Sequence, residues 1–270
     1  INNGISTNKL GVSKQGFVYS FLRKFTPTFV YDFFKLDTYY LASSDVVSDL
    51  LQSAMGLKKE KIIICGYPKL DKCFCPNKRN GINILYAPTY RGDYNSELDI
   101  LSIYGFDLDR AEEILKDNSA KLTIRLHPAN KLPEHLMNAI RAKDCIIIDE
   151  TEDVYDTLNT YSLVITDFSS IYFDALAVGI NALLAPFGYQ DYVTNDRDLY
   201  FPLNEIYPGE MPYDWDAFFS NFSYYVTSNN VDLSRIREKF YSHPCSPSSA
   251  ELSHLIHNKL CKGPGNEPVS

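Results

Sequence analysis

The chain has no excess of basic residues, no pair of cysteines at metal-binding spacing and no long apolar run. Its 26 Lys and Arg residues are outnumbered by 34 Asp and Glu residues, which gives a formal net charge of -8. A surface that follows a nucleic-acid backbone needs an excess of Lys and Arg, so this balance predicts that the chain binds no nucleic acid. Any phosphate that it binds must be held by a local site.

The six cysteines contain no CxxC pair, and none has a His at zinc-finger spacing. Cys73 and Cys75 alternate along an extended stretch, which suits neither a strain-free disulfide nor a metal site without distant ligands. We therefore expect no metal and no cofactor, and we expect reduced thiols in a cytoplasmic protein.

No segment has the length of a membrane span, and no signal peptide opens the chain. The longest mostly apolar stretch, residues 175–188, falls short of the ~20 residues that a membrane-spanning helix needs and contains Asn181. The chain begins Ile-Asn-Asn-Gly, without the basic segment and apolar run of a secretory signal. Because an initiator Met is also missing, the sequence favours a fragment of a longer protein.

From about residue 80 onward, short β-rich runs alternate with amphipathic stretches. The expected strands are 83–86, 122–126, 145–148, 163–166 and 182–185, and the expected helical segments are 108–116, 133–142, 154–159 and 170–178. Strands that recur between helical segments, with β-branched residues on both faces, indicate a parallel sheet covered by helices. The sequence therefore predicts an α/β fold with a doubly wound, Rossmann-like parallel sheet.

The first part of the chain is organised differently. Residues 39–43 and 61–65 resemble strands on either side of a helix over residues 45–55, with Ser44 or Asp45 as its cap. This part is too short for a complete lobe. We predict that residues 1–75 end a truncated N-terminal lobe on the acceptor side, residues 76–260 form a nucleotide-binding lobe, and residues 261–270 are a disordered tail.

Three polar motifs follow expected strands. They are Tyr86-Ala87-Pro88-Thr89-Tyr90-Arg91, Arg125-Leu126-His127-Pro128 and Asp167-Phe168-Ser169-Ser170. In parallel α/β sheets, ligands gather at the carboxyl ends of the strands, where helix N-termini present unpaired N–H groups. We therefore expect the three motifs to lie together at one edge of the sheet and to bind a phosphate group.

Each motif also permits a plainer interpretation. Ser169 and Ser170 precede a helical pattern and suit a diphosphate, although a capping serine explains them as well. Arg125 is expected to face the same side of its strand as His127, which favours a functional pair over a structural histidine. Arg91 suits bidentate contact with an anion, or it is a solvated loop arginine.

The pair Asp107 and Asp109 looks superficially like the metal-binding DxD of many glycosyltransferases. The residues after it have a helical pattern, and acidic residues favour the first turn of a helix. We therefore expect this pair to cap a helix.

Taken in order, the motifs resemble the CDP-glycerol glycerophosphotransferases that polymerise teichoic acids and related capsule polymers. The match extends the third motif through Ile171-Tyr172-Phe173-Asp174, and it adds Ala42-Ser43-Ser44, Gly66-Tyr67-Pro68 and Pro208-Gly209. It covers most of residues 1–260 in consistent order.

The resemblance implies a GT-B architecture without a metal, in which CDP-glycerol binds the C-terminal lobe and the acceptor enters between the lobes. It assigns donor binding to a set of polar residues, namely Thr89, Arg91, Arg125, Asp167, Ser169, Ser170 and Asp174. It implies that His127 assists at the phosphates. The family's likely base, a His in a His-Gly motif, corresponds to Asn3 and Gly4, with Lys9 also on the acceptor side.

Asn3 stands where the family has His, and an amide orients a hydroxyl but accepts no proton as a general base. Our leading hypothesis is a transferase that moves glycerol phosphate, or a related polyol phosphate, from a CDP-linked donor to a hydroxyl of a polymer or lipid-linked acceptor. The alternatives are a GT-B glycosyltransferase that uses a nucleotide sugar for capsule or lipopolysaccharide synthesis, and a non-catalytic nucleotide-binding homologue.

The family resemblance also implies an enzyme at the inner face of the cell membrane. Residues 16–35 are rich in aromatics, with Arg23, Lys24 and Lys35 among them, and Thr26-Pro27 interrupts the segment. This composition suits an interfacial helical pair that makes peripheral membrane contact. The alternative is that these aromatics pack inside the N-terminal lobe.

Overall fold

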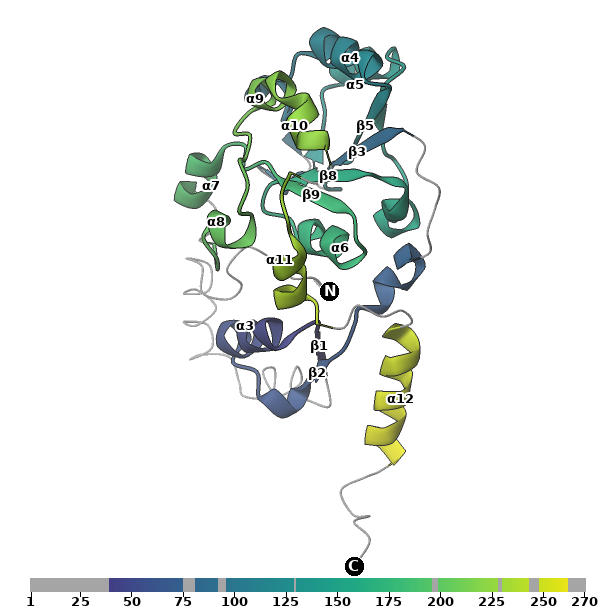
Figure 1. Ribbon diagram of the computed structural model, residues 1–270, viewed down its shortest axis with the longest axis vertical. Helices are drawn as coiled ribbons and strands as arrows, with labels where there is room; N and C mark the ends of the chain where they lie inside the picture. Colours follow the sequence, from purple (N-terminus) through teal and green to yellow (C-terminus); the bar gives the residue numbers. More distant parts are fainter. Residues whose placement is uncertain are drawn as a thin grey trace, which may run out of the picture.

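The computed structural model describes residues 39–74, 81–91, 96–128, 130–195, 199–227, 230–242 and 248–261. Figure 1 shows a larger body built around a central sheet, a smaller unit next to it, and a final helix that extends away from both. Several expectations lie outside the described residues, namely those for Asn3, Gly4, Lys9, residues 16–35, Cys75 and the tail from residue 262.

The larger body contains the five-stranded parallel sheet that the sequence predicts. Its strand order is β7 (Ile146–Ile148), β5 (Ala120–Ile124), β3 (Ile82–Tyr86), β8 (Leu163–Thr166) and β9 (Asn181–Leu184). Helices α4 (Leu108–Asp117) and α5 (Glu134–Arg141) pack on β5 and β7, and α6 (Ile171–Ala177) packs on β8 and β9. All four residues of β8 are buried, as a central strand covered on both faces requires.

Local sequence explains where these elements begin. The Asp107 side chain accepts hydrogen bonds from the N–H groups of Asp109 and Arg110, both at 3.0 Å, so Asp107 caps α4 as predicted. The predicted helix over residues 154–159 is instead two short 3₁₀ segments, η4 (Val154–Asp156) and η5 (Leu158–Thr160). β5 ends at Ile124, two residues before the predicted end, so Arg125 and His127 lie in the loop.

The smaller unit pairs β1 (Tyr40–Ala42) with β2 (Ile62–Ile64) in parallel, joined by α3 (Asp45–Met55). The Ser44 side chain accepts a hydrogen bond from the Val47 N–H group and caps α3, which confirms one of the two predicted caps. Both strands are short, with three paired residues on each.

The end of the chain returns to this smaller unit. The Ser43 hydroxyl donates to the Phe240 carbonyl at 2.6 Å, at the end of α11 (Ser234–Phe240), and the Tyr67 N–H donates to the Tyr241 hydroxyl at 2.9 Å. Asp71 accepts from the N–H groups at the start of α12 (Ser248–Cys261). Residues about 200 apart in sequence therefore join the first and last parts of the described chain.

The remaining elements connect these parts. They are η1 (Lys59–Lys61), η2 (Pro68–Phe74), β4 (Ser96–Glu97), η3 (Ser102–Tyr104), β6 (Asn130–Lys131), α7 (Tyr189–Asn195), α8 (Leu203–Ile206), α9 (Trp215–Ser220) and α10 (Phe222–Val226). Trp215 is fully buried and its ring contacts those of Tyr86, Phe106 and Phe187, so α9 is anchored on the sheet by aromatic packing.

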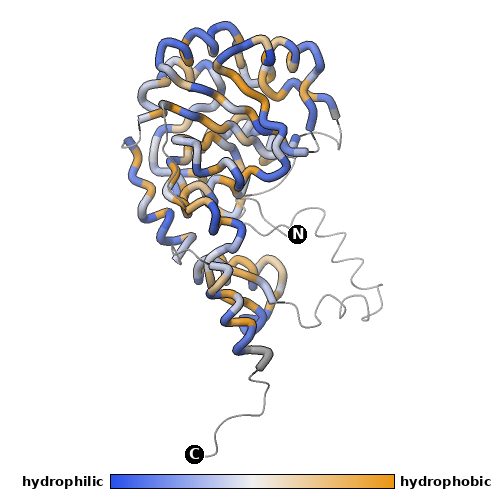
Figure 2. The backbone as a smooth tube through the Cα atoms, turned by 90° about the vertical axis from the view of Figure 1, so that its right-hand side faces the viewer, coloured by the Kyte–Doolittle hydropathy of each residue, from blue (hydrophilic) through white to orange (hydrophobic). Residues whose placement is uncertain are grey.

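Apolar segments run through the interior of the sheet body, and hydrophilic segments run along its outer helices and loops, as Figure 2 shows. Among the described helices, none combines the length and the apolar character that crossing a bilayer requires.

Candidate functional site

The loops after β3 and β8 meet at one buried carboxylate. Asp167 Oδ1 accepts hydrogen bonds from the Thr89 N–H at 2.7 Å, the Thr89 hydroxyl at 2.6 Å and the Phe168 N–H at 2.6 Å. Asp167 Oδ2 forms an ion pair with Arg91 at 2.7 Å. The structure therefore brings Thr89, Arg91 and Asp167 together at the carboxyl edge of the sheet, where their positions in the sequence predict them.

Arg91 points inward rather than into solvent. It is 8% exposed, its guanidinium contacts the rings of Phe168 and Tyr192, and it also donates to the Thr89 carbonyl at 3.3 Å. Burial lowers the pKa of Arg91, but the charge of Asp167 together with Tyr104 and Tyr86 outweighs this effect, and the pKa lies above its ordinary value. Arg91 therefore fixes the loop in this conformation, and it is not a solvated loop arginine.

The side chain of Asn130 also holds the backbone at Arg91. Asn130 accepts from the Arg91 N–H at 3.0 Å and donates to the Arg91 carbonyl at 2.6 Å. Sequence analysis missed Asn130, because a side-chain amide that pairs with a distant backbone leaves no periodic signal.

Arg125 joins the loops after β5 and β7. Its guanidinium donates to the Asp149 carboxylate at 2.7 Å and to the Thr151 hydroxyl at 2.9 Å. Burial raises the pKa of Asp149, but hydrogen bonds from Thr151 and Arg125 outweigh it and hold the pKa below its ordinary value. Arg125 is thus paired inside the protein, and Asp149 is a partner that the sequence analysis did not identify.

His127 lies in the same loop, exposed to solvent beside the ring of Tyr90, with the two ring centres 5.6 Å apart. Burial lowers the pKa of His127 below its ordinary value, and no charged group contributes to the shift. The imidazole is therefore neutral at neutral pH, and it has both a donor and an acceptor nitrogen.

Ser169 and Ser170 lie between these fixed loops and the start of α6. Both are half-buried, and neither hydroxyl forms a hydrogen bond with any described residue. Ser170 occupies the cap position of α6 in a helical conformation without a side-chain cap bond, so the capping interpretation does not explain it. The hydroxyls are available to a ligand.

Asp174 lies one turn further along α6 and is buried. Its Oδ2 atom accepts from Lys69 Nζ and from the Tyr155 hydroxyl, both at 2.7 Å, and the Tyr155 hydroxyl also accepts from Lys69 Nζ at 2.7 Å. This cluster ties η2, η4 and α6 together. Lys69 and Tyr155 are further residues that sequence analysis missed, since their roles depend on packing between distant segments.

The buried thiols offer no nucleophile. Burial raises the pKa of Cys65 to about 11 and that of Cys73 to about 11, so both remain protonated at neutral pH. Among the residues that the structure describes, no three His, Cys, Asp or Glu side chains are grouped to hold a metal ion.

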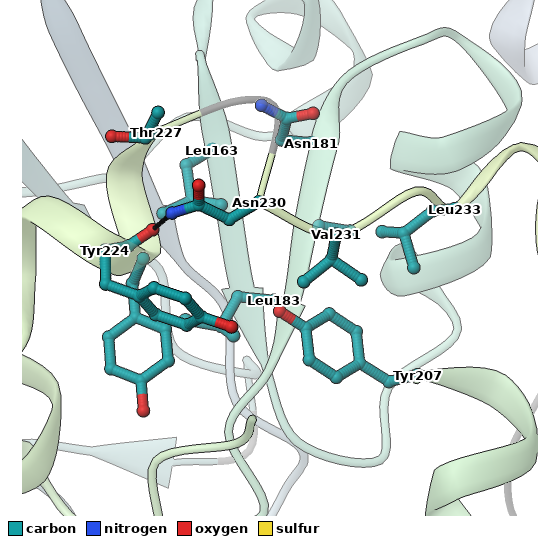
Figure 3. Close-up of a pocket in the computed structure, with 11 residues that line it drawn as sticks. Leu163, Asn181, Leu183, Tyr207, Tyr224, Thr227, Asn230, Val231 and Leu233 are labelled. Carbon is teal, nitrogen blue, oxygen red and sulfur yellow. Dashed lines mark hydrogen bonds between the residues drawn. The ribbon is translucent and has the colours of Figure 1, made fainter. Parts of the chain in front are cut away.

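Two cavities that the described residues form lie elsewhere, around the amino ends of β8 and β9. One is lined by residues including Tyr207, Asn230 and Leu163, the first residue of β8 (Figure 3), and the other by residues including Leu176 and Arg237. The candidate site at the carboxyl edge rests on the converging loops, because the partly exposed hydroxyls of Ser169 and Ser170, which have no partner among the described residues, lie there.

A family model for CDP-glycerol:poly(glycerophosphate) glycerophosphotransferase matches residues 2–262. The Staphylococcus aureus teichoic acid ribitol-phosphate polymerase TarK is 24% identical over 65% of this chain and 36% of its own. The S. aureus teichoic acid glycerol-phosphate transferase is 25% identical over 83% of this chain and 60% of its own. The chain thus spans about a third to three fifths of the length of these relatives.

Solved structures of the wall teichoic acid polymerase TagF are similar in fold. One variant soaked with CDPG has a TM-score of 0.67 and 21% identity, and the match covers 95% of this chain and 66% of the TagF chain. Another TagF variant has a TM-score of 0.64 with 20% identity over 84% of this chain and 59% of the other. These likenesses confirm the predicted GT-B-like fold.

The ion pair of Arg91 with Asp167 is expected to carry much of the stability of the carboxyl edge. Arg91→Met leaves the carboxylate buried without its cation, so we expect the free energy of unfolding to fall by about 3–5 kcal/mol in urea denaturation. Arg110→Met breaks an exposed pair with Asp216 and is a matched control with an expected cost of about 1 kcal/mol or less. Equal costs for the two variants would refute a special role for the buried pair.

Proposed function

This chain belongs to the CDP-glycerol:poly(glycerophosphate) glycerophosphotransferase family, and we propose that it forms the donor-binding part of a transferase that moves a polyol phosphate. The donor is CDP-glycerol or a related CDP-linked polyol, the acceptor is a hydroxyl of a cell-surface polymer or its lipid-linked precursor, and the released product is CMP. Relatives named for ribitol phosphate and for glycerol phosphate support this range of donors.

The observation that carries the proposal is the pair of unengaged hydroxyls on Ser169 and Ser170. They lie at the carboxyl edge of a parallel sheet, between loops whose charged side chains are already satisfied. Hydroxyls held beside fixed loops are suited to hydrogen-bond a diphosphate. Under this proposal, Thr89, Arg91, Asp167 and Asp174 shape the donor site, and Ser169 and Ser170 contact the phosphates.

The transfer is a displacement at the distal phosphorus of the donor. The acceptor oxygen forms a bond to this phosphorus, the bond from the phosphorus to the bridging diphosphate oxygen breaks, and CMP leaves with the electron pair. The proton of the acceptor hydroxyl passes to a base. Asn3 is unsuited to this role, since an amide does not accept the proton. Asn3, with Gly4 and Lys9, is proposed to orient the acceptor.

His127 is proposed to act on the transferring phosphoryl group. The imidazole is neutral before the donor binds, and in this state one of its nitrogens donates a hydrogen bond to a phosphate oxygen. A bound diphosphate brings negative charge next to the ring, and this charge raises the pKa of His127. Donor binding would therefore be accompanied by proton uptake, which gives the leaving CMP a proton donor.

Incubation with CDP-glycerol, CDP-ribitol and nucleotide sugars tests the activity. Release of CMP with incorporation of polyol phosphate into a polymer acceptor is the expected result. Preferred turnover of a nucleotide sugar would replace the proposal with a glycosyltransferase. Binding of CDP-glycerol without any product would indicate a non-catalytic homologue.

We expect the double substitution Ser169→Ala and Ser170→Ala to weaken donor binding without changing stability. The hydroxyls have no partner among the described residues, so the fold loses no hydrogen bond, whereas the donor loses two. Calorimetric titration with CDP-glycerol and a thermal melt measure the two effects. Ser53→Ala, on the exposed side of α3, is the control. Unchanged donor affinity in the double variant would remove these serines from the site.

We expect His127→Ala to lower turnover ~10²-fold or more and to affect donor binding less. Because the pKa of His127 is lowered in the free protein and raised by the donor, wild-type affinity should increase as the pH falls through neutrality. Calorimetry in buffers of different ionisation enthalpy measures the proton uptake, which His127→Gln should abolish. Proton uptake that persists in His127→Gln would assign it to another group.

The domain division and the location of the enzyme belong to the same proposal. Residues 1–75 would belong to the acceptor-side lobe and residues 76–260 to the donor lobe. Peripheral contact of residues 16–35 with the inner face of the membrane would bring the site to a lipid-linked acceptor in cell-wall or capsule assembly. Sedimentation with liposomes tests this, and equal recovery in the supernatant with and without anionic lipid would reject it.

A further inference from the structure

A groove at the amino ends of β8 and β9 lies at the opposite end of these strands from the candidate donor site. It consists of two adjoining cavities that share Asn181, Val231 and Leu233 in their walls. The smaller has a volume of about 20 Å³ and the larger, more open one about 410 Å³. The larger is within the range of about 300–1,000 Å³ that small-molecule sites have.

The small cavity is lined by the hydroxyl of Tyr207, which has no hydrogen-bond partner among the described residues. Tyr207 is 4% exposed, and Figure 3 shows its hydroxyl directed into the cavity. This hydroxyl forms no hydrogen bond with the described residues. Burial raises the pKa of Tyr207 far above its ordinary value, so the phenol keeps its proton and is a hydrogen-bond donor. The ring of Tyr207 is buried, whereas its hydroxyl remains accessible from the cavity, so a water or a ligand hydroxyl can hydrogen-bond to it.

The size of the small cavity limits what that partner is. A volume of about 20 Å³ is close to that of one water-sized probe, so the cavity admits a single water or a single hydroxyl group. The side-chain amide of Asn181, in the shared wall, is also without a partner among the described residues. A ligand hydroxyl that replaces the water would accept a hydrogen bond from Tyr207.

The larger cavity has an apolar side and one cation. Leu176, Ile180 and Val231 line it, and the guanidinium of Arg237 forms no ion pair with the described residues. Asp232 lines the same cavity, and its carboxylate accepts from the Ser234 N–H at 2.9 Å. The walls thus suit a short carbon chain with hydroxyl groups and an anionic end near Arg237.

Gly209, in the Pro208-Gly209 motif, has a role in the shape of this groove. A Cβ atom at this position would lie 2.4 Å from Val231 Cγ2 and 3.0 Å from the Tyr207 ring. A side chain there would displace the Val231 and Tyr207 side chains that form this wall. Gly209 is therefore explained by close packing against the groove.

We propose that this groove is a second binding site, for a polyol phosphate unit, with a ligand hydroxyl against Tyr207 and the phosphate against Arg237. The inference deepens the proposed function, because such a unit is what the transfer would add to the polymer. The groove would hold a segment of acceptor or product away from the reacting atoms, and Asp232 would favour hydroxyl groups over a second phosphate nearby.

Binding is tested directly on the full chain, without any requirement for turnover. Titration with glycerol 3-phosphate, glycerol or inorganic phosphate is followed by NMR at the Asn181 side-chain amide and the Arg237 Nε–H. We expect glycerol 3-phosphate to shift both signals, and glycerol to shift chiefly that of Asn181. Shifts caused equally by inorganic phosphate would show an anion site alone and overturn the proposal.

Two conservative variants locate the contacts. Tyr207→Phe removes a hydroxyl that has no described partner, so the fold should be unaffected, and glycerol 3-phosphate should bind on the order of fivefold more weakly. Arg237→Gln should remove the preference for glycerol 3-phosphate over glycerol. The controls are Tyr213→Phe, at a residue 55% exposed outside the groove, and Arg235→Gln on the same helix as Arg237.

The outcomes separate this inference from the proposed function. The groove proposal is overturned if Tyr207→Phe and Arg237→Gln both bind glycerol 3-phosphate with wild-type affinity. It is also overturned if the Asn181 signal does not shift while CDP-glycerol still binds. Either result leaves the proposed transferase activity intact. Groove binding in a protein that transfers nothing from any CDP-linked donor supports the groove and refutes the transferase.

Discussion

Asp167 is a buried carboxylate that receives hydrogen bonds from Thr89 and Phe168 and an ion pair from Arg91. A carboxylate 2% exposed is costly unless its oxygens are all engaged, and here both oxygens are. The loops after β3 and β8 therefore have one arrangement that satisfies the charge. The position of Ser169 and Ser170, two and three residues further along the chain, depends on that arrangement.

The same interaction limits how the site recognises an anion. Arg91 and Arg125, the two arginines that sequence analysis assigns to the donor, are paired with Asp167 and Asp149. Their charges are largely compensated before any ligand arrives. Under the proposed function, recognition at this edge would rest on hydroxyl groups, on N–H groups and on the neutral imidazole of His127.

The order of strands and helices was predictable because each has a strong periodic pattern, and the predicted segments around β3, β8, α3 and α4 agree with the structure. The end of β5 and the 3₁₀ segments at residues 154–160 were predicted less well, since loop contacts rather than periodicity decide them. Motif position correctly predicted that Thr89 and Asp167 meet. It did not predict that Asn130 pairs with the Arg91 backbone or that Asp149 pairs with Arg125, because both contacts depend on long-range pairing.

Net charge and local recognition act at different distances in this protein. A chain with a formal charge of -8 repels a polyanionic polymer, but salt at physiological concentration screens that repulsion beyond a Debye length of about 8 Å. Inside that range, short hydrogen bonds from neutral groups such as Ser169, Ser170 and Tyr207 are little affected by salt. An acidic protein with compensated arginines is therefore compatible with a phosphate-rich substrate, provided that its contacts are short, few and held by a rigid sheet edge.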